Sequence, residues 1–519
     1  MAGNFGFLYD PAMMRTPKAF ADLWEHSTKI HNFNSILALL HWDQETYMPP
    51  GGITARSHQI AQLAALIHDE KTGHRFKSLL EKIVYLPSGK LKIKGLSHPL
   101  KAAVREWHKD FTRYTKLPSS FVQNFSQTTS EASQVWAVAK KENNFKLFAP
   151  FLKKIIKLCQ EKAEIMGFAD HPYDALLEHY EPCMTTARVG TIFTALQKEL
   201  RHLLEKIKNS RQIDDRFLHV KIDSEKQAEL GHLILSKLPM DLSYTRLDLS
   251  NHPFSLALHP HDSRITTRIL PKAFMSNLFS VLHEAGHSFY EMGLPLEYWG
   301  TPLSEAVSLS IHESQSRWWE TLIGRSLPFW KFFYPILRKQ LPSQLKNIPL
   351  ERFYRAMNRV SPSLIRVEAD EVTYCLHVII RFEIEKELIS GNLEVSDLPA
   401  AWNAKVKEYL GITPPTDSQG CLQDIHWSLG DFGYFPTYAL GNICSAQFFS
   451  AFSKQNPAWD TQVSQGELSF VLDWLKKNIH QWGRAYNTDE LIKKATGKPL
   501  TEAAYSSYLK KKYADIYGF

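Results

Sequence analysis

The sequence of 519 residues predicts an all-α fold built as one large multi-helix unit. Apolar residues recur at spacings of three and four along seven segments, the pattern of helices with one buried face. Alternation typical of a strand is rare, and we expect at most a small β element near residues 263–270. The 27 prolines and 24 glycines are spread along the chain instead of forming a linker, so we expect one domain over residues 1–519. The helical segments are 20–40, 145–165, 189–207, 274–292, 303–323, 372–388 and 468–482.

The composition is that of an ordinary globular protein. Apolar residues make up 44% and charged residues 22%, which excludes disorder, collagen and coiled coil as the main state. The balance of 61 basic and 54 acidic residues leaves a net charge of +7, which is mild for this length. Two locally basic stretches, 90–116 and 140–162, have the pattern of solvated faces on amphipathic helices. We therefore expect no nucleic-acid partner, since such proteins gather their charge into a patch.

Neither the N-terminus nor the interior predicts targeting to a membrane. The first 20 residues lack the basic start and apolar stretch of a signal peptide. The longest uncharged stretch, 432–453, contains Gly433, Pro436 and Gly441, which are unsuited to a lipid-facing helix. The five cysteines are widely spaced and form no CxxC pair, as in a protein of a reducing compartment. We expect a cytoplasmic protein that does not contact a membrane.

The segment HEAGH at residues 283–287 is an HExxH motif. On a helix, residues four apart lie on one face about 6 Å apart along the axis, so His283 and His287 can reach one metal ion. Glu284 can then act as general base toward a water molecule at that metal. The motif is short and arises by chance in many proteins, so the alternative is two ordinary histidines on a helix.

The surroundings of the motif favour a metal site. Pro271 precedes the expected helix and Gly293 ends it, so the motif lies inside a helix with recognisable boundaries. Leu278, Phe279 and Val281 precede the motif and would bury it. A buried histidine needs a polar partner, and a metal ion is a suitable one.

A catalytic zinc site needs a third protein ligand and one open position. The metzincin extension is absent, because Tyr290 and Gly293 stand where glycine and histidine would be required. Glu305 and Glu313 are the alternatives, both on the expected helix 303–323. Glu305 lies in its first turn, where the helix dipole already favours a carboxylate, whereas an unpaired carboxylate at Glu313 would be costly in mid-helix. We therefore choose Glu313.

The motif segment and the one that follows it resemble the carboxypeptidase Taq family of zinc metallocarboxypeptidases. These segments are HEAGHSFYEMGLP at 283–295 and GTPLSEAVSLSIHESQSRWWE at 300–320. Further blocks match the family in order and extend over nearly the whole chain, which is far more specific than HExxH alone. They are WDQE (42–45), YEP (180–182), HPF (252–254), DSRIT (262–266), IRVEAD (365–370), GCLQDIHW (420–427), GYFPTY (433–438) and ATG (495–497).

The resemblance implies a helical enzyme with a deep active-site cleft, usually a homodimer. Such an enzyme removes single residues from peptide C-termini with broad tolerance of side chains. The resemblance implies His283, His287 and Glu313 as ligands of one Zn²⁺ per chain, for which Co²⁺ could substitute. The chain departs from the family pattern at Cys183, where we expect glycine, at Ser263, where we expect valine, and at Ser304-Glu305, where we expect smaller and less charged residues. None of these departures removes a ligand or the base.

The mechanism implied by this family also needs groups that stabilise the transition state. Glu284 would accept the proton of the zinc-activated water and pass it to the leaving amine. The oxyanion needs a preorganised donor, for which Tyr434 and His426 are the candidates. For Tyr434 the alternative is a packed aromatic ring with a satisfied hydroxyl.

A carboxypeptidase must also bind a free α-carboxylate, and the planar fork of arginine is suited to this. Arg366 and Arg264 are the arginines of the matched blocks, and we favour Arg366. For each, the alternative is an ion pair with a neighbouring acid, Asp370 for Arg366 and Asp262 for Arg264.

Two other functions fit parts of the pattern. A zinc endopeptidase or oligopeptidase on a similar helical cleft would need no carboxylate anchor. A non-catalytic metal-binding or RNA-associated protein would need neither a base nor an open metal position, and the intact Glu284 argues against it. We therefore expect a metallocarboxypeptidase whose substrates are peptides with a free C-terminus.

Overall fold

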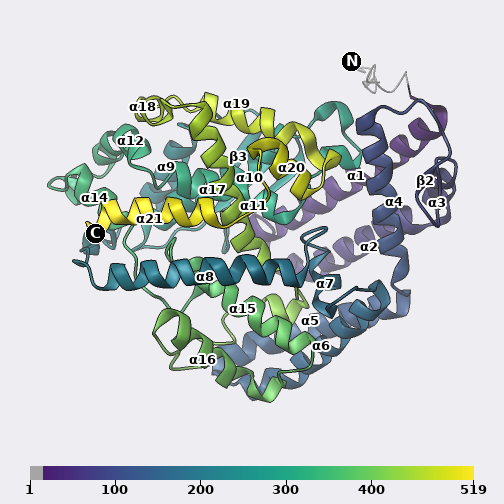
Figure 1. The fold of residues 1–519 in the computed structure, drawn as a ribbon, viewed down its shortest axis with the longest axis horizontal. Helices are drawn as coiled ribbons and strands as arrows, with labels where there is room; N and C mark the ends of the chain where they lie inside the picture. Colours follow the sequence, from purple (N-terminus) through teal and green to yellow (C-terminus); the bar gives the residue numbers. More distant parts are fainter. Residues whose placement is uncertain (1–15) are drawn as a thin grey trace.

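Helices make up most of the computed structural model, which describes residues 16–519 (Figure 1). The all-α prediction is confirmed, and six of the seven expected segments coincide closely with observed helices. The expectation about a signal peptide concerns residues that lie largely outside the described part. The two described ends of the chain lie on opposite sides of the molecule.

The helices vary from single turns to 29 residues, and the strands are short. The α-helices are α1 (Lys18–Thr46), α2 (Ile53–Thr72), α3 (His74–Glu81), α4 (His98–Lys116), α5 (Ser119–Glu142), α6 (Phe145–Met166), α7 (Pro172–Leu177), α8 (Thr186–Lys208), α9 (Ser224–Leu235), α10 (Phe274–Gly293), α11 (Leu309–Arg317), α12 (Leu327–Gln340), α13 (Pro342–Leu345), α14 (Leu350–Met357), α15 (Tyr374–Ile389), α16 (Leu398–Leu410), α17 (Pro436–Gln455), α18 (Trp459–Ser464), α19 (Ser469–Asn478), α20 (Thr488–Thr496) and α21 (Ala503–Tyr517). The strands are β1 (Val84–Tyr85), β2 (Lys90–Leu91), β3 (Thr245–Leu249), β4 (Ser255–His259) and β5 (Asp262–Thr267).

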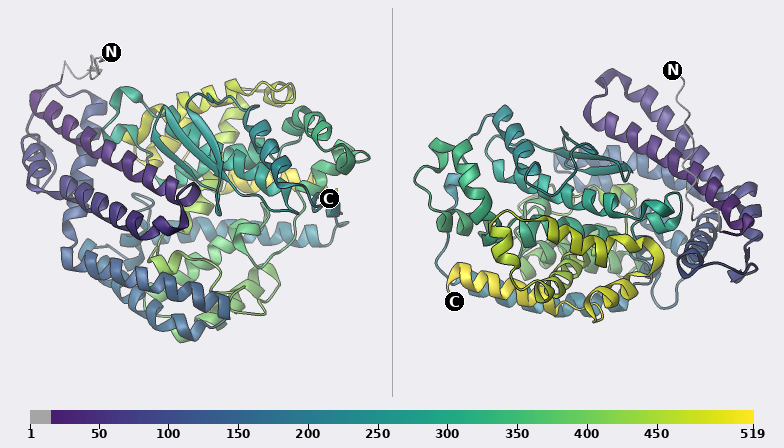
Figure 2. Two further views of the ribbon diagram at one scale, coloured as in Figure 1. Left: turned by 180° about the vertical axis from the view of Figure 1, so that it is seen from behind. Right: turned by 90° about the horizontal axis from the view of Figure 1, so that it is seen from above.

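Helices α1 to α4 pack around a hydrophobic core of their own, which we call the second core. Phe20, Leu80 and Trp107 are among its buried side chains, and the body of the protein contributes Leu303 and Ala485. These four helices project along one side of the molecule (Figure 2). All other large buried clusters of the described residues merge into one main core.

A three-stranded sheet lies against α10 and holds the short β element that the sequence predicts. The strand order is β3-β5-β4, with β3 parallel and β4 antiparallel to β5. The sequence did not reveal β3 and β4, because their five residues each are mostly half-exposed and show no regular alternation. On β5, Ser263 replaces the expected valine, and its buried hydroxyl is hydrogen-bonded to that of Ser288 at 2.7 Å.

The expected helix 303–323 is wrong as a single element. A 3-10 turn, η5 (Pro302–Ser304), is followed by extended backbone at Glu305. A new helix, α11, then begins after Ser308, whose side chain accepts a hydrogen bond from the amide of Ile311. The helix continues as a π-helical turn, η6 (Trp318–Ile323). The capping serine explains the break, since a serine at this position starts a helix.

Helices α10, α11 and α17 meet at the centre of the main core, where two glycines allow close contact. A side-chain carbon at Gly286 of α10 would lie 2.4 Å from the carbonyl oxygen of Gln315 on α11. A side-chain carbon at Gly441 of α17 would lie 2.5 Å from Cγ of Glu313. The uncharged stretch at 432–453 thus belongs largely to a buried helix of the core. Among the described residues, no helix combines the length and the hydropathy needed to cross a membrane.

The local details of two other segments agree with the sequence analysis. Cys183, where glycine is expected, has a φ of 68°, a left-handed conformation that disfavours side chains. Helix α6 buries Phe148 and Ile155 and exposes Lys153 and Lys157, as expected of an amphipathic helix with a solvated basic face.

Candidate metal centre

Helix α10 presents both histidines of the HExxH motif on one face. The rings of His283 and His287 are 4.9 Å apart between centroids, and both are mostly buried. The helix begins at Phe274, three residues after Pro271, and ends at Gly293. Because four residues make slightly more than one turn, the two Nε2 atoms point toward the same neighbouring helix.

That neighbour is α11, and it supplies Glu313. The Oε2 atom of Glu313 lies 3.6 Å from Nε2 of His283 and 3.4 Å from Nε2 of His287. The three ligand atoms all lie within 4.8 Å of one another. Burial raises the pKa of Glu313, but the charge of His283 and the hydrogen bond from His287 outweigh it and lower the pKa to about 2. The structure therefore brings together an ionised carboxylate and two imidazoles.

This donor set fits a divalent metal ion. Two imidazoles and one carboxylate are the protein ligands of many catalytic metal sites, which keep a further position open. Nδ1 of His287 is buried and has no hydrogen-bond partner among the described residues. Its ring stacks on His312 with centroids 4.5 Å apart, so packing holds its orientation.

Glu320 supports His283 from the side opposite Glu313. Its Oε2 atom lies 2.9 Å from Nδ1 of His283 and accepts a hydrogen bond of 2.7 Å from Arg317. A carboxylate at Nδ1 fixes the tautomer in which Nε2 is free to bind a metal. The sequence alone does not reveal Glu320, because the α-helix that carries Glu313 passes into the π-helical turn η6 before Glu320, and the contact with His283 crosses to another helix.

Glu284 is buried beside the ligands, with 6% of its surface exposed. Burial raises its pKa to about 7, although the charge of His283 and the hydroxyl of Ser255 on β4 act to lower it. A carboxylate with a pKa near neutrality can both accept and release a proton at neutral pH.

Glu305, the rejected ligand candidate, belongs to a separate charged cluster. Its carboxylate lies 3.1 Å from Nε2 of His31 on α1 and 2.8 Å from Arg484. Cavities of about 230 and 300 Å³ lie on either side of this cluster, between α1 and the body. The larger one reaches Glu291, one turn beyond His287 on α10, so both cavities lie beside the ligands and not at them.

Tyr434 and His426 lie together at the start of α17. Their ring centroids are 5.4 Å apart, and Tyr438 is adjacent to both. Burial raises the pKa of Tyr434, and the charge of Glu313 adds to this effect, so the phenol is protonated at neutral pH. Burial and the charge of Arg366 lower the pKa of His426 to about 4, so its ring is neutral at pH 7. Nε2 of His426 lies 3.3 Å from the hydroxyl of Tyr438.

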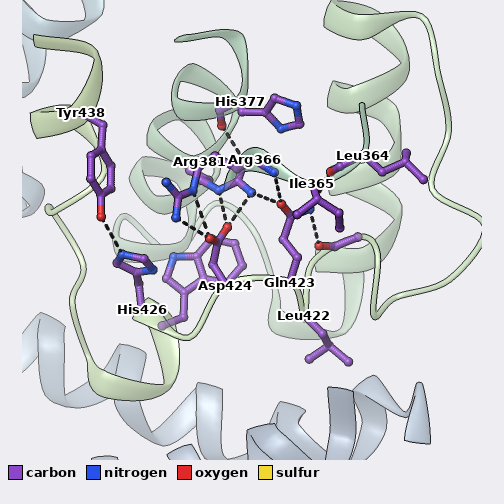
Figure 3. Close-up of polar contacts among 12 residues, drawn as sticks. Leu364, Ile365, Arg366, His377, Arg381, Leu422, Gln423, Asp424, His426 and Tyr438 are labelled. Carbon is purple, nitrogen blue, oxygen red and sulfur yellow. Dashed lines mark hydrogen bonds and ion pairs between the residues drawn. The ribbon is translucent and has the colours of Figure 1, made fainter. Parts of the chain in front are cut away.

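Arg366 is held in a buried polar network (Figure 3). Its Nε and Nη2 atoms donate to Oδ1 of Asp424 at 3.1 and 2.8 Å, and Arg381 donates to Oδ2 of the same carboxylate at 2.7 Å. The alternative of an ion pair with Asp370 is wrong, because residues 366–368 form a 3-10 turn instead of an α-helix. Asp370 accepts hydrogen bonds from backbone amides instead.

Arg264 has the ion pair that we gave as its alternative. Its Nε donates to Asp262 at 2.6 Å. Its guanidinium lies 4.7 Å from the centre of the Trp42 ring, and Arg246, its register partner on β3, lies 4.9 Å from the same ring. The two arginines therefore connect the sheet to the end of α1 through one tryptophan.

Comparisons with known proteins identify the family of the chain. The family model described as carboxypeptidase Taq (M32) metallopeptidase matches residues 22–513. Thermostable carboxypeptidase 1 of Thermus thermophilus is 40% identical over 518 residues, which cover 97% of this chain and 100% of the relative. Carboxypeptidase 1 of Bacillus subtilis is 38% identical, with 96% and 98% covered. The crystal structure of M32 carboxypeptidase from Deinococcus radiodurans R1 is 37% identical and has a TM-score of 0.93, with 97% and 100% covered. The chain therefore belongs to the carboxypeptidase Taq (M32) family of metallopeptidases and is a metallocarboxypeptidase.

Proposed function

We propose that the chain hydrolyses the last peptide bond of peptides with a free C-terminus, using His283, His287 and Glu313 to hold one Zn²⁺. The observation that carries this proposal is the convergence of three ligand atoms within 4.8 Å beside the buried Glu284. A bound zinc ion, or Co²⁺ in its place, would polarise the scissile carbonyl and make water a better nucleophile.

Glu284 is the proposed general base. It takes a proton from the attacking water and delivers it to the leaving amine. A pKa of about 7 suits both steps, because the group is then an adequate base before the transfer and an adequate acid after it. Ser255 of β4 favours the ionised form of this carboxylate, which keeps the pKa from rising further.

Tyr434 is the proposed donor to the developing oxyanion. Its hydroxyl keeps its proton, since burial raises its pKa, and its ring packs against Tyr438, which also lies beside Arg366. His426 is a weaker candidate for direct contact, because its Nε2 faces Tyr438 and its Nδ1 is buried. We propose that His426 acts mainly by orienting Tyr438.

Arg366 is the proposed anchor of the substrate carboxylate. Three of its five N–H groups are used by Asp424 and Tyr374, which leaves one on each terminal nitrogen. The guanidinium lies 4.9 Å from the centre of the Tyr438 ring, and Tyr438 in turn packs against Tyr434. Arg264 is the less favoured anchor, because Asp262 and Trp42 engage it at the sheet.

The α1–α2 surface supports the proposal of a homodimer. Only Ile67 is buried among the 20 residues of α2. Ile53 and Leu66 of α2 and Ile36 of α1 are more than 40% exposed. An exposed apolar face of this kind marks a contact surface, since burying it is favourable. We expect Leu66→Glu to give a monomer by light scattering, while Val138→Glu, at an exposed valine of α5, leaves the assembly unchanged.

We propose that the protein is located in the cytoplasm. The five cysteines are free thiols, four of them buried and Cys183 exposed. An exposed free thiol is usual in reducing compartments and uncommon in secreted proteins.

A timed digest of a defined peptide tests the function as a whole. The metal-loaded protein should release single residues in order from the C-terminus, and a chelator should stop the reaction. An amidated copy of the same peptide should be a much poorer substrate. Internal cleavage of both peptides at equal rates would instead support the endopeptidase alternative.

A further inference from the structure

The loop between Arg366 and α15 is a rigid unit that ends at Tyr374. Asp370 accepts hydrogen bonds from the amides of Ser361, Val372 and Thr373 at 2.9 to 3.0 Å. The amide of Tyr374 then donates to the carbonyl of Asp370 at 2.9 Å as the helix begins. These bonds hold the start of α15, and with it Tyr374, against the loop that follows Arg366 without any help from a ligand.

The hydroxyl of Tyr374 has a hydrogen that is free to bind a ligand. The oxygen accepts a hydrogen bond of 3.2 Å from Nη1 of Arg366, so its own hydrogen must point elsewhere. Within residues 16–519, the hydroxyl donates no hydrogen bond, and the one from Arg366 is the only one it accepts. Tyr374 is partly exposed, and burial raises its pKa to about 12, so the hydroxyl is protonated at neutral pH.

Tyr374 lies between the carboxylate anchor and the metal ligands. The guanidinium of Arg317 lies 5.1 Å from the centre of its ring, and Arg317 also holds Glu320, the partner of His283. The charge of Glu313 acts on the Tyr374 phenol as well. In a peptide, the scissile carbonyl and the terminal carboxylate are separated by one residue, about 3.8 Å between α-carbons. A group that binds the carboxylate must therefore lie close to both sites.

Asp424 restricts what Arg366 can do alone. It occupies the edge formed by Nε and Nη2, which is one of the two edges suited to a bidentate carboxylate contact. A second hydrogen-bond donor beside Nη1 of Arg366 would give the substrate carboxylate a further contact. We propose that the Tyr374 hydroxyl donates a hydrogen bond to the terminal carboxylate of the substrate, next to Arg366, and so determines the preference for a free C-terminus. This inference rests on the proposed carboxypeptidase function and on Arg366 as the anchor.

The test uses full-length, zinc-loaded protein with Glu284→Gln to prevent hydrolysis. Calorimetry would compare the Kd of one peptide as the free acid and as the C-terminal amide. Tyr374→Phe should raise the Kd of the free acid by about tenfold or more, as expected for loss of a hydrogen bond to a charged group. The Kd of the amide should stay unchanged. Tyr409→Phe is the matched control, since it also removes a tyrosine hydroxyl. The hydroxyl of Tyr409, on α16, donates to Glu383, which lies on α15 as Tyr374 does.

The outcomes separate this inference from the proposed function. Equal binding of acid and amide by the Glu284→Gln parent would reject the carboxypeptidase proposal. If the parent preferred the free acid and Tyr374→Phe kept the same preference, the role of Tyr374 would be overturned, whereas the carboxypeptidase proposal would stand.

A second comparison separates direct contact from an effect through Arg366. In an Arg366→Met background, Asp424 keeps its bond to Arg381, so the network retains one cation. Adding Tyr374→Phe to the Arg366→Met protein should still weaken binding of the free-acid peptide. If the double variant bound the free acid as well as Arg366→Met alone, with unchanged melting temperature and zinc content, Tyr374 would only position Arg366.

Discussion

At the scale of single residues, the proposed chemistry depends on the carboxylate of Glu284, which would have to move a proton. Glu284→Gln preserves the size of the side chain and removes its basicity. We expect the variant to bind zinc as the parent does, while kcat falls by about a thousandfold or more, near the upper range for general acid–base catalysis. Metal analysis and peptide hydrolysis measure the two effects. Appreciable turnover by the zinc-loaded variant would exclude Glu284 as the base.

Glu320 makes a different contribution, through the orientation of His283. Glu320→Gln replaces a charged acceptor, held by Arg317, with an amide that can present either end to Nδ1. Loss of a partner of this kind typically lowers metal affinity by about 10- to 100-fold. Competition with a chelator gives the affinity directly, without the need for activity.

Glu229→Gln is the control for this change, because Glu229 is exposed on α9 and, among the described residues, forms an ion pair with Lys226 alone. If Glu320→Gln and Glu229→Gln bound zinc equally well, Glu320 would have no role in holding His283.

At the scale of elements, the distance between α17 and α11 determines where Glu313 lies. Gly441→Ala would place a carbon 2.5 Å from Cγ of Glu313, so the side chain or the helix must shift. We expect a loss of stability of about 1–3 kcal/mol from overpacking, and a weaker affinity for zinc. Denaturant unfolding and chelator competition measure these effects.

Gly190→Ala on α8 is the matched control, since no atom lies within 4 Å of the added carbon. In a helix interior this change should stabilise the protein by about 0.5–1 kcal/mol. A Gly441→Ala protein that behaved in the same way would show that the close contact does not constrain Glu313.

Sequence periodicity predicted the long helices but could not predict where two of them meet. The HExxH helix was identifiable because its ligands lie four residues apart on one element. Glu320 reaches His283 across two helices, and Asp424 reaches Arg366 from a block 58 residues away, so neither contact has a local signature. The break at Ser308 was missed because apolar spacing continues through it, although the serine itself was a capping signal.

At the scale of the whole molecule, Arg484 joins the N-terminal helices to the body. It forms ion pairs of 2.8 Å with Glu106 and Asp110 of α4 and with Glu305. Arg484→Met would leave these acids without their shared cation. Removing one partner of a mostly buried ion pair costs about 3–5 kcal/mol. We expect a lower melting temperature and faster amide hydrogen exchange in α4.

Arg201→Met is the comparison variant, since the pair of Arg201 with Glu408 is about half exposed and such pairs contribute little. If amide hydrogen exchange in α4 were unchanged in Arg484→Met, the apolar contacts of the second core would suffice to hold the N-terminal helices against the body.

The second core also bears on how the chain folds during synthesis. Most of its side chains come from α1 to α4, so they leave the ribosome together and can collapse early through local contacts. Leu303 and Ala485, which complete this core, arrive much later. Glu313 likewise precedes Gly441, the residue against which it packs. A nascent chain therefore carries all three ligands before it has the helix that fixes their positions, and firm retention of the metal must await the last quarter of translation.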